Sequence, residues 1–96
     1  MDEFRHVSIS EIKPSPENDQ LYKPIDPNSK AIQELALSLV NNGVLEPLVI
    51  TLDGWIISGH RRYAAAKVAG LEHLPCRIEP IYRASNLGEF VNRLRE

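Results

Sequence analysis

The segment between residues 47 and 70 limits the possible folds of this chain more than any other. It contains two short runs rich in β-branched and apolar residues, Pro47 to Leu52 and Trp55 to Ser58, which are separated by Asp53-Gly54. Such runs are typical of strands, and Asp-Gly tolerates the positive φ angles that a two-residue hairpin turn requires. The segment therefore predicts a β-hairpin.

A helix follows the second predicted strand after a single glycine. Gly59 interrupts the strand pattern, the residues from His60 to Ala69 have a helical pattern, and Gly70 can end the helix in a left-handed conformation. Small side chains let this helix lie close to a sheet; they are those of Ala65, Ala66 and Ala69. We therefore expect a strand, a glycine and a packed helix in immediate succession.

Two segments precede the first long helix of the chain. Val7, Ile9 and Ile12 suggest a short edge strand. The stretch from Lys13 to Pro27 contains four prolines among polar residues, and proline has no N–H group to donate to a sheet. This stretch predicts a surface loop, and loops of this length in compact domains often bind ligands.

Three further elements are predicted from periodicity and end signals. Apolar residues from Ser29 to Asn42 repeat at the spacing of an amphipathic helix, and Gly43 follows as its C-terminal residue. Leu74 to Ile81 is typical of a strand with a proline near each end. A last helix begins near Leu87, where Asn86 and Glu89 resemble a capping box.

Together these elements predict an α/β (α+β) fold with a small mixed sheet, a β-hairpin and three helices. A length of 96 residues allows one hydrophobic core, so we expect residues 1–96 to form a single domain. The last helical pattern continues to the end of the sequence. We therefore expect this domain to be a fragment of a longer chain.

Charge and cysteine content exclude several classes of protein. The formal net charge of -2 argues against a protein that mainly grips a long nucleic-acid backbone. Cys76 is the one cysteine, which excludes an internal disulfide, and we expect it to be a buried structural residue. No apolar run reaches the roughly 18 residues of a membrane span, and the N-terminus has no signal-peptide core. These features predict a cytoplasmic protein with no membrane segment.

The densest positive charge lies where the predicted hairpin becomes a helix. The first amides of a helix have no partner inside it, and the helix dipole adds positive potential there, so anions bind readily. Arg61 and Arg62 point about 100° apart on a helix, so we expect one to hold an anion and the other a structural carboxylate. The alternative is an exposed basic helix start that binds nothing.

The order of motifs from Val7 to Ile81 resembles the N-terminal domain of the ParB and sulfiredoxin superfamily. The matching text is ISEIKPSPEN, NNGVLEPLVI and DGWIISGHRRYAAAKVAGLEHLPCRI, in which GHRR stands at the place of the ParB GERR box. The resemblance implies a ParB/sulfiredoxin-like fold that binds a nucleoside triphosphate, CTP or ATP, with Mg. The residues that it assigns to the phosphate site are Ser58, Gly59, His60, Arg61, Arg62 and Lys23. Lys23 stands in a stretch similar to the QPR segment of ParB proteins, where it keeps the charge of the arginine but not its planar fork.

Two departures from the family concern catalysis. His60 stands where sulfiredoxins have their cysteine, so reduction of a sulfinic acid is not expected. ParB proteins have glutamate at the same place and a later Glu-Asn-rich box that assists hydrolysis, of which Ser85-Asn86-Leu87 is a faint echo. Hydrolysis therefore stays open, and we expect His60 to be a neutral hydrogen-bond donor to a phosphate.

Three functions follow from these observations. The first is a nucleotide-binding module that controls a DNA-associated or partner-binding activity of a longer bacterial protein, with a homodimer as an option; DNA contact by this domain alone should be weak and salt-sensitive. The second is a metal-dependent nuclease or phosphotransfer enzyme of the same fold, although the nearby acids Glu46, Asp53 and Glu72 have no recognisable metal spacing. The third is an interaction domain without a ligand.

Overall fold

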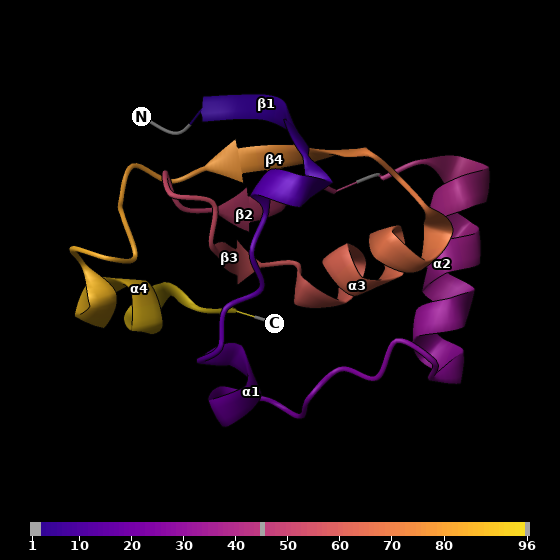
Figure 1. The fold of residues 1–96 in the computed structure, drawn as a ribbon, viewed down its shortest axis with the longest axis horizontal. Helices are drawn as coiled ribbons and strands as arrows, with labels where there is room; N and C mark the ends of the chain where they lie inside the picture. The colour runs from indigo at the N-terminus through magenta and orange to yellow at the C-terminus, as the bar shows by residue number, and fades with distance from the viewer. Residues whose placement is uncertain (1–2, 45, 96) are drawn as a thin grey trace.

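The computed structural model describes residues 3–44 and 46–95, which form a four-stranded mixed sheet with helices around it (Figure 1). The strands lie across the sheet in the order β1-β4-β2-β3. Their bounds are Glu3–Ser8 for β1, Leu48–Ile50 for β2, Ile56–Ser58 for β3 and His73–Ile78 for β4. β4 pairs antiparallel with β1 and parallel with β2, and β3 pairs antiparallel with β2. The predicted α/β class with a mixed sheet and a β-hairpin is confirmed.

Three helices of seven or more residues occur in the described part of the chain, as predicted. They are α2, Lys30–Asn42; α3, His60–Ala69; and α4, Leu87–Arg93. α2 begins where the hydroxyl of Ser29 accepts a hydrogen bond from the amide of Ile32, and it ends where the amide of Gly43 donates to the Leu39 carbonyl. Among the residues described, no helix has the length and apolar character needed to cross a bilayer.

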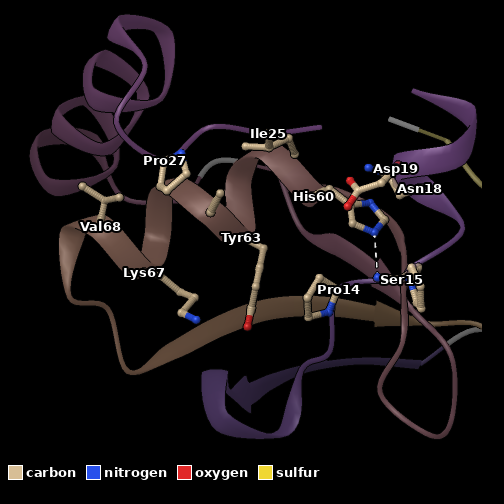
Figure 2. Close-up of a pocket in the computed structure, with 12 residues that line it drawn as sticks. Pro14, Ser15, Asn18, Asp19, Ile25, Pro27, His60, Tyr63, Lys67 and Val68 are labelled. Carbon is tan, nitrogen blue, oxygen red and sulfur yellow. Dashed lines mark hydrogen bonds between the residues drawn. The ribbon is translucent and has the colours of Figure 1, made fainter. Parts of the chain in front are cut away.

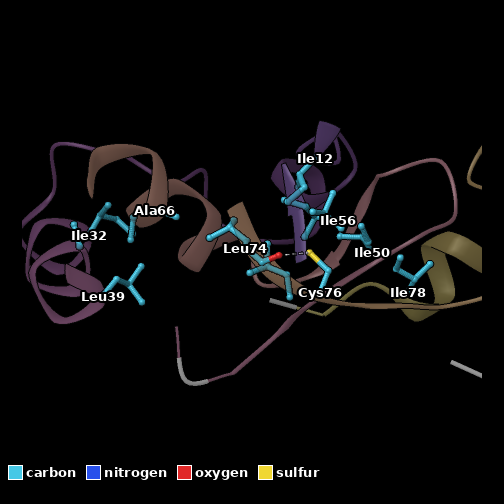
Figure 3. Close-up of a cluster of buried hydrophobic side chains, with 13 residues drawn as sticks. Ile12, Ile32, Leu39, Ile50, Ile56, Ala66, Leu74, Cys76 and Ile78 are labelled. Carbon is cyan, nitrogen blue, oxygen red and sulfur yellow. Dashed lines mark hydrogen bonds between the residues drawn. The ribbon is translucent and has the colours of Figure 1, made fainter. Parts of the chain in front are cut away.

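The main hydrophobic core lies between the sheet and the adjacent pair of helices α2 and α3 (Figure 3). Leu48 of β2 and Ile56 of β3 are fully buried there, together with Ala65 and Ala66 of α3. The small alanine side chains let the α3 backbone approach the sheet closely, as the sequence predicts. Leu39 brings α2 into the same cluster. The start of α3 is therefore fixed against the rest of the fold.

The opposite face of the hairpin packs against α4. Val49 and Ile57 alternate with the residues of the main core and so point to the other side of the sheet, where Phe90 of α4 joins them in a second cluster. The carboxylate of Glu79, just after β4, is buried beside this helix. It pairs with Arg93 at 2.8 Å and with two further arginines at 3.5 Å, Arg77 and Arg95.

Arg83 ties the proline-containing loop to the segment that precedes α4. Its guanidinium stacks on the ring of Trp55 at 4.4 Å and forms a forked ion pair with Glu17. Burial raises the pKa of Glu17, but the hydrogen bonds and positive charge of Arg83, together with a backbone hydrogen bond, outweigh this effect and lower the pKa overall. The loop from Lys13 to Pro27 also contains a one-turn helix, α1 Asn18–Leu21, which the sequence did not predict.

The hairpin connection is longer than predicted, so the expected two-residue turn at Asp53-Gly54 is wrong. Five residues, 51–55, connect the paired residues Ile50 and Ile56. Gly54 has φ 86°, whereas no non-glycine residue in the described chain has a positive φ, as a turn of that type would require at Asp53. The carboxylate of Asp53 instead accepts hydrogen bonds from the Thr51 hydroxyl at 2.6 Å and from the backbone amides of residues 83 and 84. The tight turn lies one residue earlier than predicted, because the Gly54 amide donates to the Thr51 carbonyl at 3.0 Å.

Several strand bounds and one predicted cap also differ from the prediction; β2 and β3, for example, are shorter than the runs predicted at 47–52 and 55–58. β1 ends at Ser8, and a 3-10 turn, η1 Ile9–Glu11, follows it, so of the predicted edge-strand residues only Val7 lies in the strand. β4 ends at Ile78 and not at Ile81, since Pro80 has no amide to extend the pairing. The side chain of Asn86 makes no capping hydrogen bond, so the predicted capping box does not form.

Candidate functional site

Gly59 makes the sharp change of direction between β3 and α3. Its φ of 108° is rarely adopted by residues with a side chain, and a Cβ at this position would lie 2.8 Å from Cγ of Leu48. The glycine is therefore required by backbone conformation and by close packing on β2. This contact, rather than room for a ligand, accounts for the missing side chain.

The start of α3 presents backbone donors without partners. The first hydrogen bond at this end runs from the Tyr63 amide to the Gly59 carbonyl at 2.8 Å. No atom of the described residues accepts from the preceding amides, those of His60, Arg61 and Arg62. Ser58 lies half-buried at the adjacent end of β3. This arrangement has the unpaired donors and positive potential that favour an anion.

Arg61 and Lys23 line one cavity, although they are far apart in the sequence. The cavity has a volume of about 400 Å³ and lies between the start of α3, the segment from Lys23 to Asp26 and the start of α2 at Ser29. Arg61 is exposed, and in the part of the chain that the structure describes no carboxylate lies within ion-pair distance of its guanidinium. Two exposed cationic side chains therefore border the same space.

Arg62 has a different role from its neighbour. Its guanidinium donates to the carbonyl of Pro47 at 3.2 Å and lies 3.6 Å from the carboxylate of Glu46. Its Nε atom is buried without a hydrogen-bond partner in the described chain. The two arginines therefore have different surroundings, with Arg62 beside the carboxylate of Glu46 and Arg61 at a cavity, and the binding of an anion by Arg61 stays a prediction.

His60 is buried, with 4% of its surface exposed. Its Nε2 accepts a hydrogen bond from the backbone amide of Ser15 at 3.1 Å. Burial lowers the pKa of His60 to about 4, and the nearby carboxylate of Asp19 opposes this shift. This pKa agrees with the predicted neutral state of His60, although the cause is burial and not the neighbouring arginines, and its hydrogen bond to a phosphate stays a prediction.

A second cavity of about 510 Å³ lies between α3 and the proline-containing loop (Figure 2). Its α3 side consists of residues that recur at the spacing of one helix face: His60, Tyr63, Ala64, Lys67 and Val68. The loop contributes apolar walls and a few polar groups, among them Ser15, Asn18 and Asp19. Sequence reasoning missed this group, because polar residues in a proline-rich loop are usually solvated.

Other candidate residues have structural explanations. Cys76 is buried, and burial raises the pKa of its thiol to about 11, which confirms the prediction of a structural cysteine. Of the three acids considered, Glu46 pairs with Arg62, Asp53 holds the hairpin connection, and Glu72 lies outside both cavities. Within residues 3–44 and 46–95, no group of three His, Cys, Asp or Glu side chains is arranged to hold a metal ion.

Comparison with known sequences identifies close relatives. The family model described as the ParB N-terminal domain matches residues 1–88. The "Probable chromosome-partitioning protein ParB" of Vibrio cholerae is 38% identical over 84 residues, which cover 82% of this chain and 27% of that protein. The "Stage 0 sporulation protein J" of Bacillus subtilis is 33% identical over 82 residues, or 81% and 27% of the two chains. The chain thus spans about a quarter of the length of these relatives.

Solved structures agree with the sequence relatives on the fold. The ParB-N domain of a Pnob8-like protein superposes with a TM-score of 0.75 at 17% identity, over 94% of this chain and 34% of the other. A truncated ParB of Caulobacter crescentus, complexed with CTP-γ-S, has a TM-score of 0.72 at 23% identity, over 93% and 51% of the two chains. Sulfiredoxin of Arabidopsis thaliana has a TM-score of 0.70 at 23% identity, over 93% and 97%. The chain belongs to the ParB N-terminal domain family.

Proposed function

We propose that this domain binds a nucleoside triphosphate, CTP or ATP, and that the bound nucleotide controls a DNA-associated activity of the chromosome-partitioning type. The observation that supports it most is the cavity shared by Lys23 and Arg61 beside the unpaired amides of α3. The CTP-γ-S bound to the Caulobacter crescentus neighbour indicates the type of ligand, and the chromosome-partitioning names of the relatives indicate the type of activity.

The phosphates lie at the start of α3 in this proposal. Lys23 and Arg61 contribute charged donors, and a hydrogen bond to a charged group is worth about 1.5–3 kcal/mol. Together with contacts from the three free amides, at about 1 kcal/mol each, the sum approaches the roughly 8 kcal/mol of a micromolar complex. Ser58 and Gly59 come directly before these amides in the chain, although neither lines the cavity of Lys23 and Arg61. Arg62 supports the site indirectly by holding Glu46 and the Pro47 carbonyl.

Magnesium fits this site as a partner of the phosphates. Asp26 is the acidic residue among those that line the Lys23 and Arg61 cavity. Mg²⁺ is usually held by one or two carboxylates, by substrate phosphates and by several waters, so one aspartate suffices. When bound, the ion neutralises phosphate charge, and Asp26 would be the protein ligand that orients it.

In this proposal the domain binds the nucleotide without hydrolysing it, and the state of His60 supports this. Its Nε2 lone pair is already used by the Ser15 amide, so the proton of the neutral ring is on Nδ1. A ring in this state can donate a hydrogen bond, but it has no free lone pair with which to take a proton from water. The imidazole is therefore not a general base.

The DNA-associated activity belongs to the longer protein in this proposal. This chain covers 27% of the Vibrio cholerae relative, and its net charge is -2. We therefore expect the domain alone to bind DNA weakly and with strong salt dependence. Nucleotide would act by changing how the domain contacts a second copy or the remainder of its own chain.

Isothermal titration and thermal unfolding with CTP, ATP, GTP and UTP, each with and without Mg²⁺, test the proposal. We expect at least one nucleotide to bind and to raise the melting temperature. Arg61→Ala and Lys23→Ala should each weaken binding tenfold or more, whereas Arg5→Ala removes the same charge from β1 and should have no effect. Absence of binding at millimolar nucleotide, or equal losses in Arg5→Ala and Arg61→Ala, would refute the proposal. Release of phosphate in the same samples would instead favour an enzyme.

A further inference from the structure

Arg83 is in contact with three separate segments of the domain. Its guanidinium forms a forked ion pair with Glu17 of the proline-containing loop, in which Nε donates to the two carboxylate oxygens at 3.1 and 3.3 Å. It also stacks on Trp55 of the hairpin connection at 4.4 Å, and it lies 5.8 Å from the centre of the Phe90 ring in α4. One side chain therefore joins the loop, the hairpin connection and α4.

The backbone of Arg83 is held by the same hairpin connection. One carboxylate oxygen of Asp53 accepts from the Arg83 amide at 3.0 Å, and the other accepts from the amide of Ala84 at 3.3 Å. The side chains of Arg83 and Glu17 are 23% and 15% exposed. An exposed ion pair contributes little to stability, but a covered pair that loses one partner leaves an uncompensated charge. Neither side chain is therefore easily released alone.

The proline-containing loop is anchored before Glu17 but not after it. Before it, the Ser15 amide donates to His60 at 3.1 Å, and the Ser15 hydroxyl donates to a carbonyl of β3. After it, within the part of the chain that the structure describes, no hydrogen bond or ion pair joins residues 19–25 to a residue outside the loop. The ion pair of Glu17 is thus the last such contact before the segment that contains the lysine of the proposed phosphate site.

The loop and α4 are attached to the same edge strand of the sheet. The strand is β3, where the carbonyl of Ile56 accepts from Ser15 and the carbonyl of Ile57 accepts from the amide of Arg95, just after α4, at 2.8 Å. Figure 1 shows α1, which lies within the loop, and α4 both on the β3 side of the sheet. Two segments that are far apart in the sequence are therefore neighbours at this edge, and Arg83 connects them.

We propose that Glu17 and Arg83 form a latch that couples the proline-containing loop to α4, so that the two segments open and close together. When the loop leaves, Arg83 keeps its charge beside Trp55 and Phe90 but loses the carboxylate that compensates it. When the segment before α4 shifts, Glu17 loses its charged donors in the same way. Each segment is therefore more stable in its closed position while the other is closed, which is the condition for coupling.

Hydrogen exchange of single amides, measured by NMR on the domain without any nucleotide, tests the latch. The Tyr22 amide reports on the loop and the Phe90 amide reports on α4, because each donates a local hydrogen bond of 2.8 Å. We expect Glu17→Gln to speed exchange of both amides about tenfold, because it removes the charge from the hydrogen bonds that hold the two segments together. Arg83→Gln should have the same effect, and either variant is sufficient if the other does not fold.

Glu34→Gln is the matched control for these variants. It makes the same chemical change at an exposed ion pair, that with Lys30, and should alter neither amide. The Ile9 amide donates to the carbonyl of Glu72 at 2.9 Å, outside both segments, and it should keep its wild-type rate in every variant. This amide separates opening of the latch from a general loss of stability.

The decisive measurement is the Phe90 amide in Glu17→Gln, because Glu17 pairs with Arg83 and not with a residue of α4. If Glu17→Gln changes the loop amide alone or changes neither amide, the two segments are independent and the inference is wrong. It is equally wrong if Ile9 or the Glu34→Gln control shows the same increase. No nucleotide enters the experiment, so these outcomes do not depend on the proposed function.

Discussion

Replacing Gly59 by alanine tests whether packing on Leu48 sets the start of α3. At φ 108° a side chain is strained, which costs about 1–2 kcal/mol, and the new Cβ would lie 2.8 Å from a buried Leu48 carbon. Relief of such an overlap in a packed core costs a further 1–3 kcal/mol or so. We therefore expect Gly59→Ala to lower the free energy of unfolding by about 2–5 kcal/mol, measured by urea denaturation.

Gly70→Ala is the matched control for this experiment. Gly70 also has a positive φ, of 75°, and it ends the same helix, but nothing lies within 4 Å of the place where its Cβ would be. Gly70→Ala should thus show only the backbone cost, about 1–2 kcal/mol. Equal losses in the two variants would show that the contact with Leu48 does not constrain the site, and the argument for a fixed helix start would then fail.

Three other predictions follow from buried groups. The pKa of His60 is lowered from 6.5 to about 4, so the unfolded chain binds the proton more tightly than the folded chain. The free energy of unfolding should therefore fall by about 3 kcal/mol as the pH falls from 6.5 to 4. This part of the pH dependence should be absent in His60→Gln. Glu79→Gln should destabilise the fold by about 1–3 kcal/mol in urea, because the arginines around this buried position then face a neutral amide, whereas Glu89→Gln at the exposed partner of Arg93 should change little; similar effects would contradict the buried role of Glu79. Cys76, with a pKa raised to about 11, should react with a thiol reagent only after unfolding, and rapid reaction of the native domain would show that it is accessible.

The strand and helix pattern was readable wherever one face of an element enters the core. The strand that contains Ile56 has the apolar pattern of a strand, and the alanines of α3 repeat with the period of a helix. Both elements are found at the predicted places. The errors occur where a distant contact overrides a local preference. Asp53-Gly54 favours a tight turn, but Asp53 instead binds backbone amides near residue 83, a partner that no local pattern could supply.

The sequence predicted where the candidate site lies but not which arginine has which role. The sequence marked Arg61 and Arg62 as a cationic pair, and it expected their roles to differ without deciding which would take the carboxylate. Glu46 and the Pro47 carbonyl decide this, because they lie beside Arg62 in space. The hydrogen bond between His60 and Ser15 could not be predicted from the sequence either, because it depends on how the proline-containing loop crosses α3.

The place of β4 in the sheet has a consequence for synthesis of the chain. β4 is the last strand among the described residues, yet it lies between β1 and β2 and supplies the partner for both. Until it leaves the ribosome, β1 has no neighbour, and the hairpin of β2 and β3 has an open edge. Phe4 finds its partner position only when Arg77 has been made. Such distant pairings slow folding, so the nascent domain should close its sheet in one late step rather than strand by strand.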